Sequence, residues 1–275
     1  MNGAPTVAQR AKPRTLGTAN PHRQPGAGLP TTPRALARRD PTLAAAGAVS
    51  LAASIVCAVL ALGDGVWWKP TTFALSIAVY VWTVAWLAAG LRPSRLLRVV
   101  RLGTVALLAV EWALIALQAG RGVASHFNGA TPFDAAVFSA MGATIGAVTV
   151  LAGVLLVLSV RDGRGLPAAT RRAVPLGLAL FLVGTAVGGA MIVAGGRALA
   201  GPAPGLPLVS WDLSAGDLRP AHFVGLHAAQ VVPAVGVWAD RRTWPLRRGV
   251  RLVWMASAVY AAAVAALYGL ALTAP

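Results

Sequence analysis

Seven long apolar runs follow one another from residue 42 onwards, and they constrain the fold of this chain more than any other feature. Each run is close to the roughly 20 residues that an α-helix needs to cross the hydrocarbon core of a bilayer. The runs cover residues 42–62, 71–91, 102–119, 135–160, 173–196, 221–239 and 252–272. They are too long and too uniformly apolar for barrel strands, and lipid offers the backbone no hydrogen-bond partner. We therefore expect an all-α integral membrane protein, with a seven-helix transmembrane bundle over residues 42–275.

The scarcity of charge excludes the soluble classes of protein. Only 12% of the 275 residues are charged, whereas soluble domains carry roughly 25%. The net charge of +16 would suggest nucleic-acid binding in a soluble chain. Here the arginines are divided among connecting segments with few aromatic residues between them, so we expect contact with anionic lipid headgroups and no nucleic-acid partner. The lipid bilayer is the expected partner.

The distribution of basic residues predicts the orientation of the bundle. Residues 1–41 are polar, rich in proline and arginine and without an apolar period, so they predict a disordered basic tail. If the tail is cytoplasmic, 20 of the 24 lysines and arginines lie on the cytoplasmic side, as the positive-inside rule requires. The four on the outer side are Lys69, Arg121, Arg197 and Arg219. We expect a cell (inner) membrane protein with a cytoplasmic N-terminus and an extracytoplasmic C-terminus.

Two pairs of glycines indicate where helices approach each other closely. Gly142 and Gly146 are four residues apart, as are Gly184 and Gly188. Glycines at this spacing share one face of a helix and allow a neighbouring backbone to come near. Both motifs therefore predict close packing between helices.

Histidines near the outer ends of the predicted helices are the first candidates for chemistry. His126, His222 and His227 supply three nitrogen ligands, and Asp134 or Asp217 could complete a zinc or copper site. Two histidines on different helices could instead hold a haem. His222 and His227 are five residues apart and so do not share a helix face as a His-x-x-x-His pair would. The favoured interpretation is a metal- or haem-dependent membrane enzyme that acts on a lipophilic substrate.

Acidic residues supply the candidates for proton transfer. Glu111 lies in the middle of an apolar run, where a carboxyl group is costly and is by default a functional candidate. Asp134 and Asp217 lie near the outer face and are further catalytic candidates. Each also has a simpler explanation as a helix cap or a loop acid, and Asp134 is expected to be the N-cap of the fourth helix.

Four further side chains are candidates for substrate binding: Asn128, Trp211, Gln118 and Gln230. Gln118 lies two turns from Glu111 on the same helix stripe, and Gln230 shares a face with His227. The segment 197–219 is the longest outer connection and is expected to form a lid over an outward-facing polar site.

Two stretches resemble segments of bacterial multi-pass membrane proteins. They are Ser125-His126-Phe127-Asn128 with Phe133-Asp134, and residues 216–227. The resemblance covers the outer halves of the fourth and sixth spans and implies no particular activity.

Three other functions remain open. Glu111 could protonate a lipophilic substrate without a cofactor, as small membrane terpene cyclases do by class. Glu111, His227 and Gln230 could instead form the relay of a proton-coupled transporter. The chain could also be a structural or assembly protein without chemistry.

Overall fold

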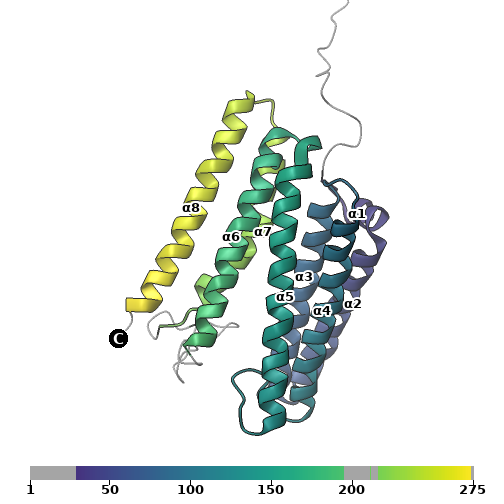
Figure 1. Cartoon of the computed structure of the whole chain (residues 1–275), viewed down its shortest axis with the longest axis vertical. Coiled ribbons are helices and arrows are strands. Elements are labelled where there is room, and N and C mark those ends of the chain that lie inside the picture. The colour runs from purple at the N-terminus through teal and green to yellow at the C-terminus, as the bar shows by residue number, and fades with distance from the viewer. Residues whose placement is uncertain (1–28, 195–210, 212–215, 274–275) are drawn as a thin grey trace, which may run out of the picture.

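The computed structural model describes residues 29–194, 211 and 216–273, and within them the chain forms helices and no strand (Figure 1). The helices are α1 (Pro33–Arg39), α2 (Pro41–Ala61), η1 (Gly65–Trp67), α3 (Trp68–Ala88), α4 (Arg95–Gly120), α5 (Pro132–Asp162), η2 (Gly163–Gly165), α6 (Ala168–Val193), α7 (Arg219–Asp240) and α8 (Leu246–Thr273). In this part of the chain seven helices, α2 to α8, are long and apolar enough to cross a membrane. The predicted number of such helices is therefore confirmed.

Several helices extend beyond the apolar runs that predicted them. The third run begins at residue 102, but α4 begins at Arg95 and includes Arg98 and Arg101 in its first two turns. An arginine can continue a helix at a membrane interface because its apolar stem lies along the surface while its head reaches water. Hydropathy alone therefore placed this boundary too late.

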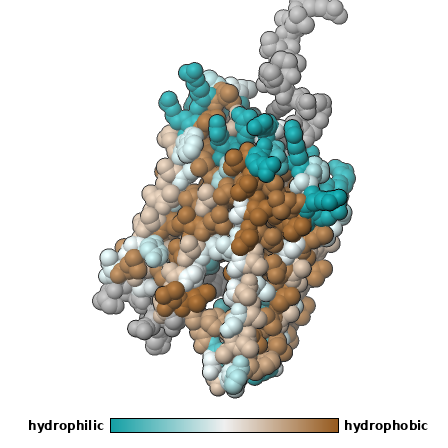
Figure 2. Space-filling view, in the orientation of Figure 1, coloured by the Kyte–Doolittle hydropathy of each residue, from teal (hydrophilic) through white to brown (hydrophobic). Residues whose placement is uncertain are grey.

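Successive helices run in opposite directions, so their connections alternate between two ends of the bundle (Figure 1). We call one end of the bundle the arginine-rich end. It carries α1 and the segments 89–95, 161–172 and 241–248. We call the other end the opposite end, and it carries segments 62–67, 121–131 and 216–218. On the face shown in Figure 2, hydrophilic residues gather at the arginine-rich end and apolar residues cover the middle of the bundle.

The last residues of the predicted tail are packed against the bundle. The indole Nε1 of Trp86 donates a hydrogen bond to the carbonyl oxygen of Pro30 at 2.9 Å. Asp40 caps α2 through the amide of Leu43 and forms an ion pair with Arg101 at 2.5 Å. The prediction of disorder up to residue 41 is wrong for residues 29–40, because caps and an ion pair hold them. Residues 1–28 lie outside the described part of the chain.

Large aliphatic side chains fill the bundle in the half nearer the arginine-rich end. We call this group the apolar plug. It is made by Leu43, Leu87, Leu97, Leu155 and Leu178, which come from α2, α3, α4, α5 and α6, and each is at most 5% exposed. The plug separates the arginine-rich end from the part of the bundle that holds Glu111.

The two glycine motifs have different outcomes. A Cβ atom on Gly184 of α6 would lie 2.5 Å from the backbone carbon of Gly225 in α7, so this motif makes the predicted close contact. A Cβ atom on Gly142 or Gly146 of α5 would meet nothing within 4 Å, so the prediction is wrong for that pair within the described residues. Close backbone approach is therefore a property of the contact between α6 and α7.

We expect Gly184→Ala to lower the free energy of unfolding by about 1–3 kcal/mol, because the added methyl group meets backbone atoms that cannot rotate away. Gly142→Ala is the matched control and should leave stability unchanged or slightly higher. Thermal unfolding in detergent, followed by circular dichroism, measures both. Equal stability of the two variants would contradict the assignment.

Candidate functional site

Glu111 lies inside the bundle because of its position on α4. The buried residues of this helix recur at intervals of three or four and include Leu108, Glu111, Ile115 and Gln118. This spacing places them on one face, which is turned towards the neighbouring helices. Glu111 is only 1% exposed, and it lies about 14 Å along the helix axis from Gly120, given a rise of about 1.5 Å per residue.

One carboxylate oxygen of Glu111 is hydrogen-bonded and the other is not. The hydroxyl of Thr144 in α5 donates to Oε2 at 2.6 Å. The same hydroxyl lies 2.8 Å from the carbonyl oxygen of Met141. Oε1 accepts no hydrogen bond from the residues that the structure describes. Because a hydroxyl has one hydrogen, Thr144 donates to only one of its two acceptors at a time.

Lys69 brings a positive charge into the same region. Its ammonium group in α3 is close enough to Glu111, His126 and Arg219 for their charges to affect one another. Lys69 also lines a small cavity of about 40 Å³, together with Ile115, Ala119 and Ser125. A cavity of this size has space for about one to three water molecules. Ile115, which lines it, is one helical turn from Glu111 towards the opposite end of the bundle.

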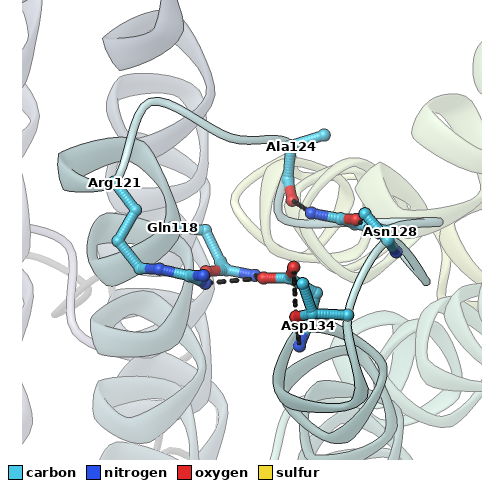
Figure 3. Close-up of polar contacts among 7 residues, drawn as sticks. Gln118, Arg121, Ala124, Asn128 and Asp134 are labelled. Atoms are coloured by element: carbon cyan, nitrogen blue, oxygen red, sulfur yellow. Dashed lines mark hydrogen bonds and ion pairs between the residues drawn. The ribbon is translucent and has the colours of Figure 1, made fainter.

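A set of four side chains joins the end of α4 to the start of α5 (Figure 3). We call it the α4–α5 clamp. Nε2 of Gln118 donates to Oδ1 of Asp134 at 2.9 Å, and Nη1 of Arg121 donates to the same oxygen at 2.6 Å and also to Oε1 of Gln118. The hydroxyl of Thr131 donates to Oδ2 of Asp134 at 2.6 Å. Both oxygens of this buried carboxylate are therefore occupied.

The clamp corrects the predicted cap. Thr131, not Asp134, is the N-cap of α5, because its hydroxyl oxygen accepts a hydrogen bond from the amide of Asp134 at 3.1 Å. Asp134 is the third residue of the helix, and its carboxylate accepts from the capping hydroxyl. The geometry gives Asp134 and Gln118 a structural role, while their predicted catalytic and substrate-binding roles stay predictions.

Asn128 shapes the loop between α4 and α5 (Figure 3). Its Nδ2 donates to the carbonyl oxygen of Ala124 at 2.9 Å, and its Oδ1 accepts from the amide of Ala130 at 3.0 Å. The side chain is therefore used to hold the loop, and its predicted contact with a substrate stays a prediction.

His126 is enclosed by aromatic rings in the same loop. Its ring lies 5.3 Å from that of Phe73 and 6.1 Å from that of Phe138, and its Nδ1 lies 3.0 Å from Oγ of Ser125. Burial, followed by the positive charge of Lys69, lowers the pKa of His126 to about 3. His126 is therefore neutral at physiological pH.

His222 and His227 lie on α7 in different surroundings. Nδ1 of His222 donates to the carbonyl oxygen of Gly184 at 2.7 Å, where α7 crosses α6. The ring of His227 packs edge-on against Phe223 at 4.2 Å, and Phe223 in turn lies 5.1 Å from Trp211. His222 therefore serves the helix contact, and His227 packs with Phe223 of α7 in an aromatic group that Trp211 joins from the segment before the helix.

Asp217 and Gln230 are also separate from Glu111. Both carboxylate oxygens of Asp217 accept from the guanidinium of Arg219, at 2.8–3.0 Å, at the start of α7. Nε2 of Gln230 donates to the hydroxyl of Thr83 at 2.8 Å, and its Oε1 is buried without a partner among the described residues. Among the described residues no hydrogen bond joins His227 or Gln230 to Glu111, and the relay between them stays a prediction.

The arrangement of the histidines does not fit the predicted metal centre, whereas a haem held by two histidines stays a prediction. His126, His222 and His227 each have their own neighbours, and within the described residues no three His, Cys, Asp or Glu side chains come together to hold a metal ion. Zinc and copper sites need three or four such ligands converging on one point. We therefore derive no chemical step through a metal or a haem.

Lys69, Thr144 and Arg121 belong to these polar groups and were missed as candidates. Lys69 is a basic residue on the predicted outer side, where basic residues are rare, and that exception was a usable signal. Thr144 lies between Gly142 and Gly146 in an apolar run, and a single hydroxyl there gives no distinct signal in the sequence. Most of the predicted lid, namely residues 197–210 and 212–215, lies outside the described residues.

Comparisons with known proteins assign no family to this chain. No protein-family model, no curated protein and no solved structure matched the chain.

We expect Asp134→Ala to lower the denaturant concentration at which half of the protein is unfolded, because it leaves the amide of Gln118 and the charge of Arg121 without their partner. Asp162→Ala is the control, since this aspartate at the other end of α5 makes no side-chain cap bond. Chemical denaturation in detergent compares the two. A loss of stability for Asp162→Ala as large as that for Asp134→Ala would refute the clamp.

We expect the buried ring of His126 to make the protein less stable in acid. Its folded-state pKa of about 3 lies below the ordinary value of 6.5, so below pH 6.5 the unfolded chain binds a proton that the folded chain does not. Stability should fall as the pH drops from 6.5 towards 3, by on the order of 5 °C in Tm between pH 7 and pH 5. His126→Phe should remove this part of the pH dependence. An unchanged pH profile in the variant would sink the assignment.

Proposed function

We propose that this is a multi-pass protein of the bacterial inner membrane that works as a proton-coupled transporter, and that the structure corresponds to its outward-facing state, in which Glu111 exchanges a proton with the extracytoplasmic side. In this proposal the arginine-rich end is cytoplasmic, as the positive-inside rule favours. The opposite end, with the loop between α4 and α5, then faces outwards. The seven apolar helices support membrane insertion.

The observation that carries the proposal is the position of the Thr144 hydroxyl between two acceptors. When Glu111 is ionised, Thr144 donates to Oε2, and 2.6 Å is a typical length for a hydroxyl bonded to a carboxylate. When Glu111 is protonated, its own hydroxyl donates to Oγ1 of Thr144, and Thr144 turns its hydrogen to the carbonyl oxygen of Met141, 2.8 Å away. In each protonation state the Thr144 hydroxyl therefore has an acceptor, and Oε2 of Glu111 stays hydrogen-bonded to it.

The electrostatic surroundings of Glu111 also suit a group that changes its charge. Burial at 1% exposure disfavours the ionised form, whereas the nearby positive charge of Lys69 favours it. These two effects act in opposite directions on the charge of Glu111. A structural carboxylate, such as that of Asp134, is instead held by donors on both oxygens.

The surroundings of Glu111 favour access from one end. The water-sized cavity beside Lys69 lies between Glu111 and the opposite end. Towards the arginine-rich end the way is filled by the apolar plug, in which Leu87 and Leu155 are each 1% exposed. A proton can move through a few water molecules, but it cannot enter a close-packed apolar core without a large cost in free energy.

The size of this cavity favours a proton over a lipophilic substrate. Pockets for organic ligands usually measure roughly 300–1,000 Å³, whereas the cavity near Glu111 measures about 40 Å³. The described residues around Glu111 therefore suit water and a proton better than the acid-catalysed reaction of a lipid. The separate histidines give a metal- or haem-dependent enzyme no support.

The proposal predicts that a pH step on the outer side moves charge into the membrane. Protein reconstituted in vesicles on a solid-supported membrane should give a transient current after the step, because the proton travels part of the way across the bilayer to Glu111. Glu111→Gln should abolish the current, since the amide cannot bind the proton. Thr144→Val should reduce it, because both hydrogen-bond arrangements use the Thr144 hydroxyl, which valine lacks.

Asp162→Asn is the matched control, because it removes a carboxylate that lies at the arginine-rich end of α5, and it should keep the current. An equal current in Glu111→Gln would contradict the proposal. Conversion of membrane lipids to new products, with no charge movement, would favour the cofactor-free enzyme instead.

A further inference from the structure

A second cavity lies at the arginine-rich end, at the start of α4. It has a volume of about 300 Å³ and is lined by Pro93, Ser94, Arg95, Leu97, Arg98 and Arg101. This volume is at the lower end of the range for small-molecule sites. Three of the six lining residues are arginines, and none is acidic, so the chemistry of the cavity suits an anion.

Two of these arginines are available to a ligand. Arg95 and Arg98 are exposed, and their guanidinium groups form no hydrogen bond or ion pair with the residues that the structure describes. Arg101 differs, because its Nε is bound to the carboxylate of Asp40 at 2.5 Å. Guanidinium groups bind phosphate oxygens in pairs of parallel hydrogen bonds, which favours a phosphate group as the anion.

An apolar strip lies beside the cavity on the same helix. Leu96, Val99 and Leu102 are 46%, 55% and 47% exposed and recur every three residues. On an α-helix each of them is one residue, or about 100°, from the arginines of the cavity, so the two faces are adjacent. A molecule that fits both faces has an anionic head and apolar chains.

We propose that this cavity binds the phosphate headgroup of an anionic phospholipid, with its acyl chains along Leu96, Val99 and Leu102. Basic pockets on the cytoplasmic side of membrane helices suit such headgroups because headgroup and arginines meet at the same depth. Binding here would fasten α4, the helix that carries Glu111, to the inner leaflet. The site rests on the proposed insertion and orientation, and does not depend on proton binding by Glu111.

The test measures phosphatidylglycerol binding to the whole protein in detergent micelles by native mass spectrometry. Arg95→Gln/Arg98→Gln should weaken binding roughly 25-fold, given the usual contribution of two arginines near a lipid surface. Arg171→Gln/Arg172→Gln removes the same charge at the same end, from exposed positions outside the cavity, and should leave the affinity unchanged. Equal weakening in both variants would show diffuse attraction and overturn the site.

Two further measurements separate the sources of phosphate and check the fold. Inorganic phosphate should not displace the lipid, because it has no chains to lie on the apolar strip. Displacement by inorganic phosphate as effective as displacement by free lipid would assign the cavity to a soluble anion and overturn the proposal. Leu96→Ser/Val99→Ser should weaken lipid binding while the arginines stay in place, and all variants should keep the circular dichroism of the parent. Lipid binding as strong in this pair as in the parent would contradict the role of the strip.

Discussion

The apolar exterior of the bundle requires that buried polar side chains find their partners inside the protein. Where the donors and acceptors match, such pairs also join helices. Asp40 joins the start of α2 to Arg101 of α4. Asp240, at the end of α7, accepts from the amides of Ala169 and Thr170 at 3.1 and 2.7 Å and so caps the start of α6. Carboxylates with donors on both oxygens are structural elements of this fold.

Glu111 stands apart from this pattern. Its single hydrogen-bond donor, Thr144, has a second acceptor within reach, and its Oε1 has no donor among the described residues. A carboxyl group whose hydrogen-bond partner can act as donor or acceptor, and which is not held by donors on both oxygens, is suited to binding and releasing a proton. The charge of Lys69 and the water-sized cavity lie between Glu111 and the opposite end of the bundle. The apolar plug lies between Glu111 and the arginine-rich end. The same helix thus carries a proton site in one half and arginines for lipid in the other.

The sequence predicted the helices well because their apolar runs are long and a membrane span has a nearly fixed length. It also identified Glu111, because a carboxyl in such a run is costly under any arrangement. It did not predict which polar side chains meet. His126, His222 and His227 share a predicted side of the membrane, yet each packs against its own neighbours. Depth along a helix follows from residue number, whereas contact also depends on how neighbouring helices are rotated and spaced.

The amino-terminal segment shows a second limit of sequence reasoning. Its composition predicts disorder, but the ion pair between Asp40 and Arg101 links positions 61 residues apart. Composition indicates how much apolar surface a segment can bury by itself, and it gives no information about a partner so far along the chain. The glycine motifs have the same limit, because Gly142 and Gly184 lie in similar sequence contexts and only Gly184 meets a neighbouring helix closely.

Access to Glu111 from one side of the membrane is the central claim, and infrared difference spectroscopy of uniformly oriented vesicles tests it most directly. The pH is stepped on one side at a time while the carboxyl band of Glu111 is recorded, with Glu111→Gln used to identify that band. We predict that a step on the side of the α4–α5 loop changes the band promptly and that a step at the arginine-rich side leaves it unchanged. A band that responds to the arginine-rich side, or that responds to neither side, would contradict the account.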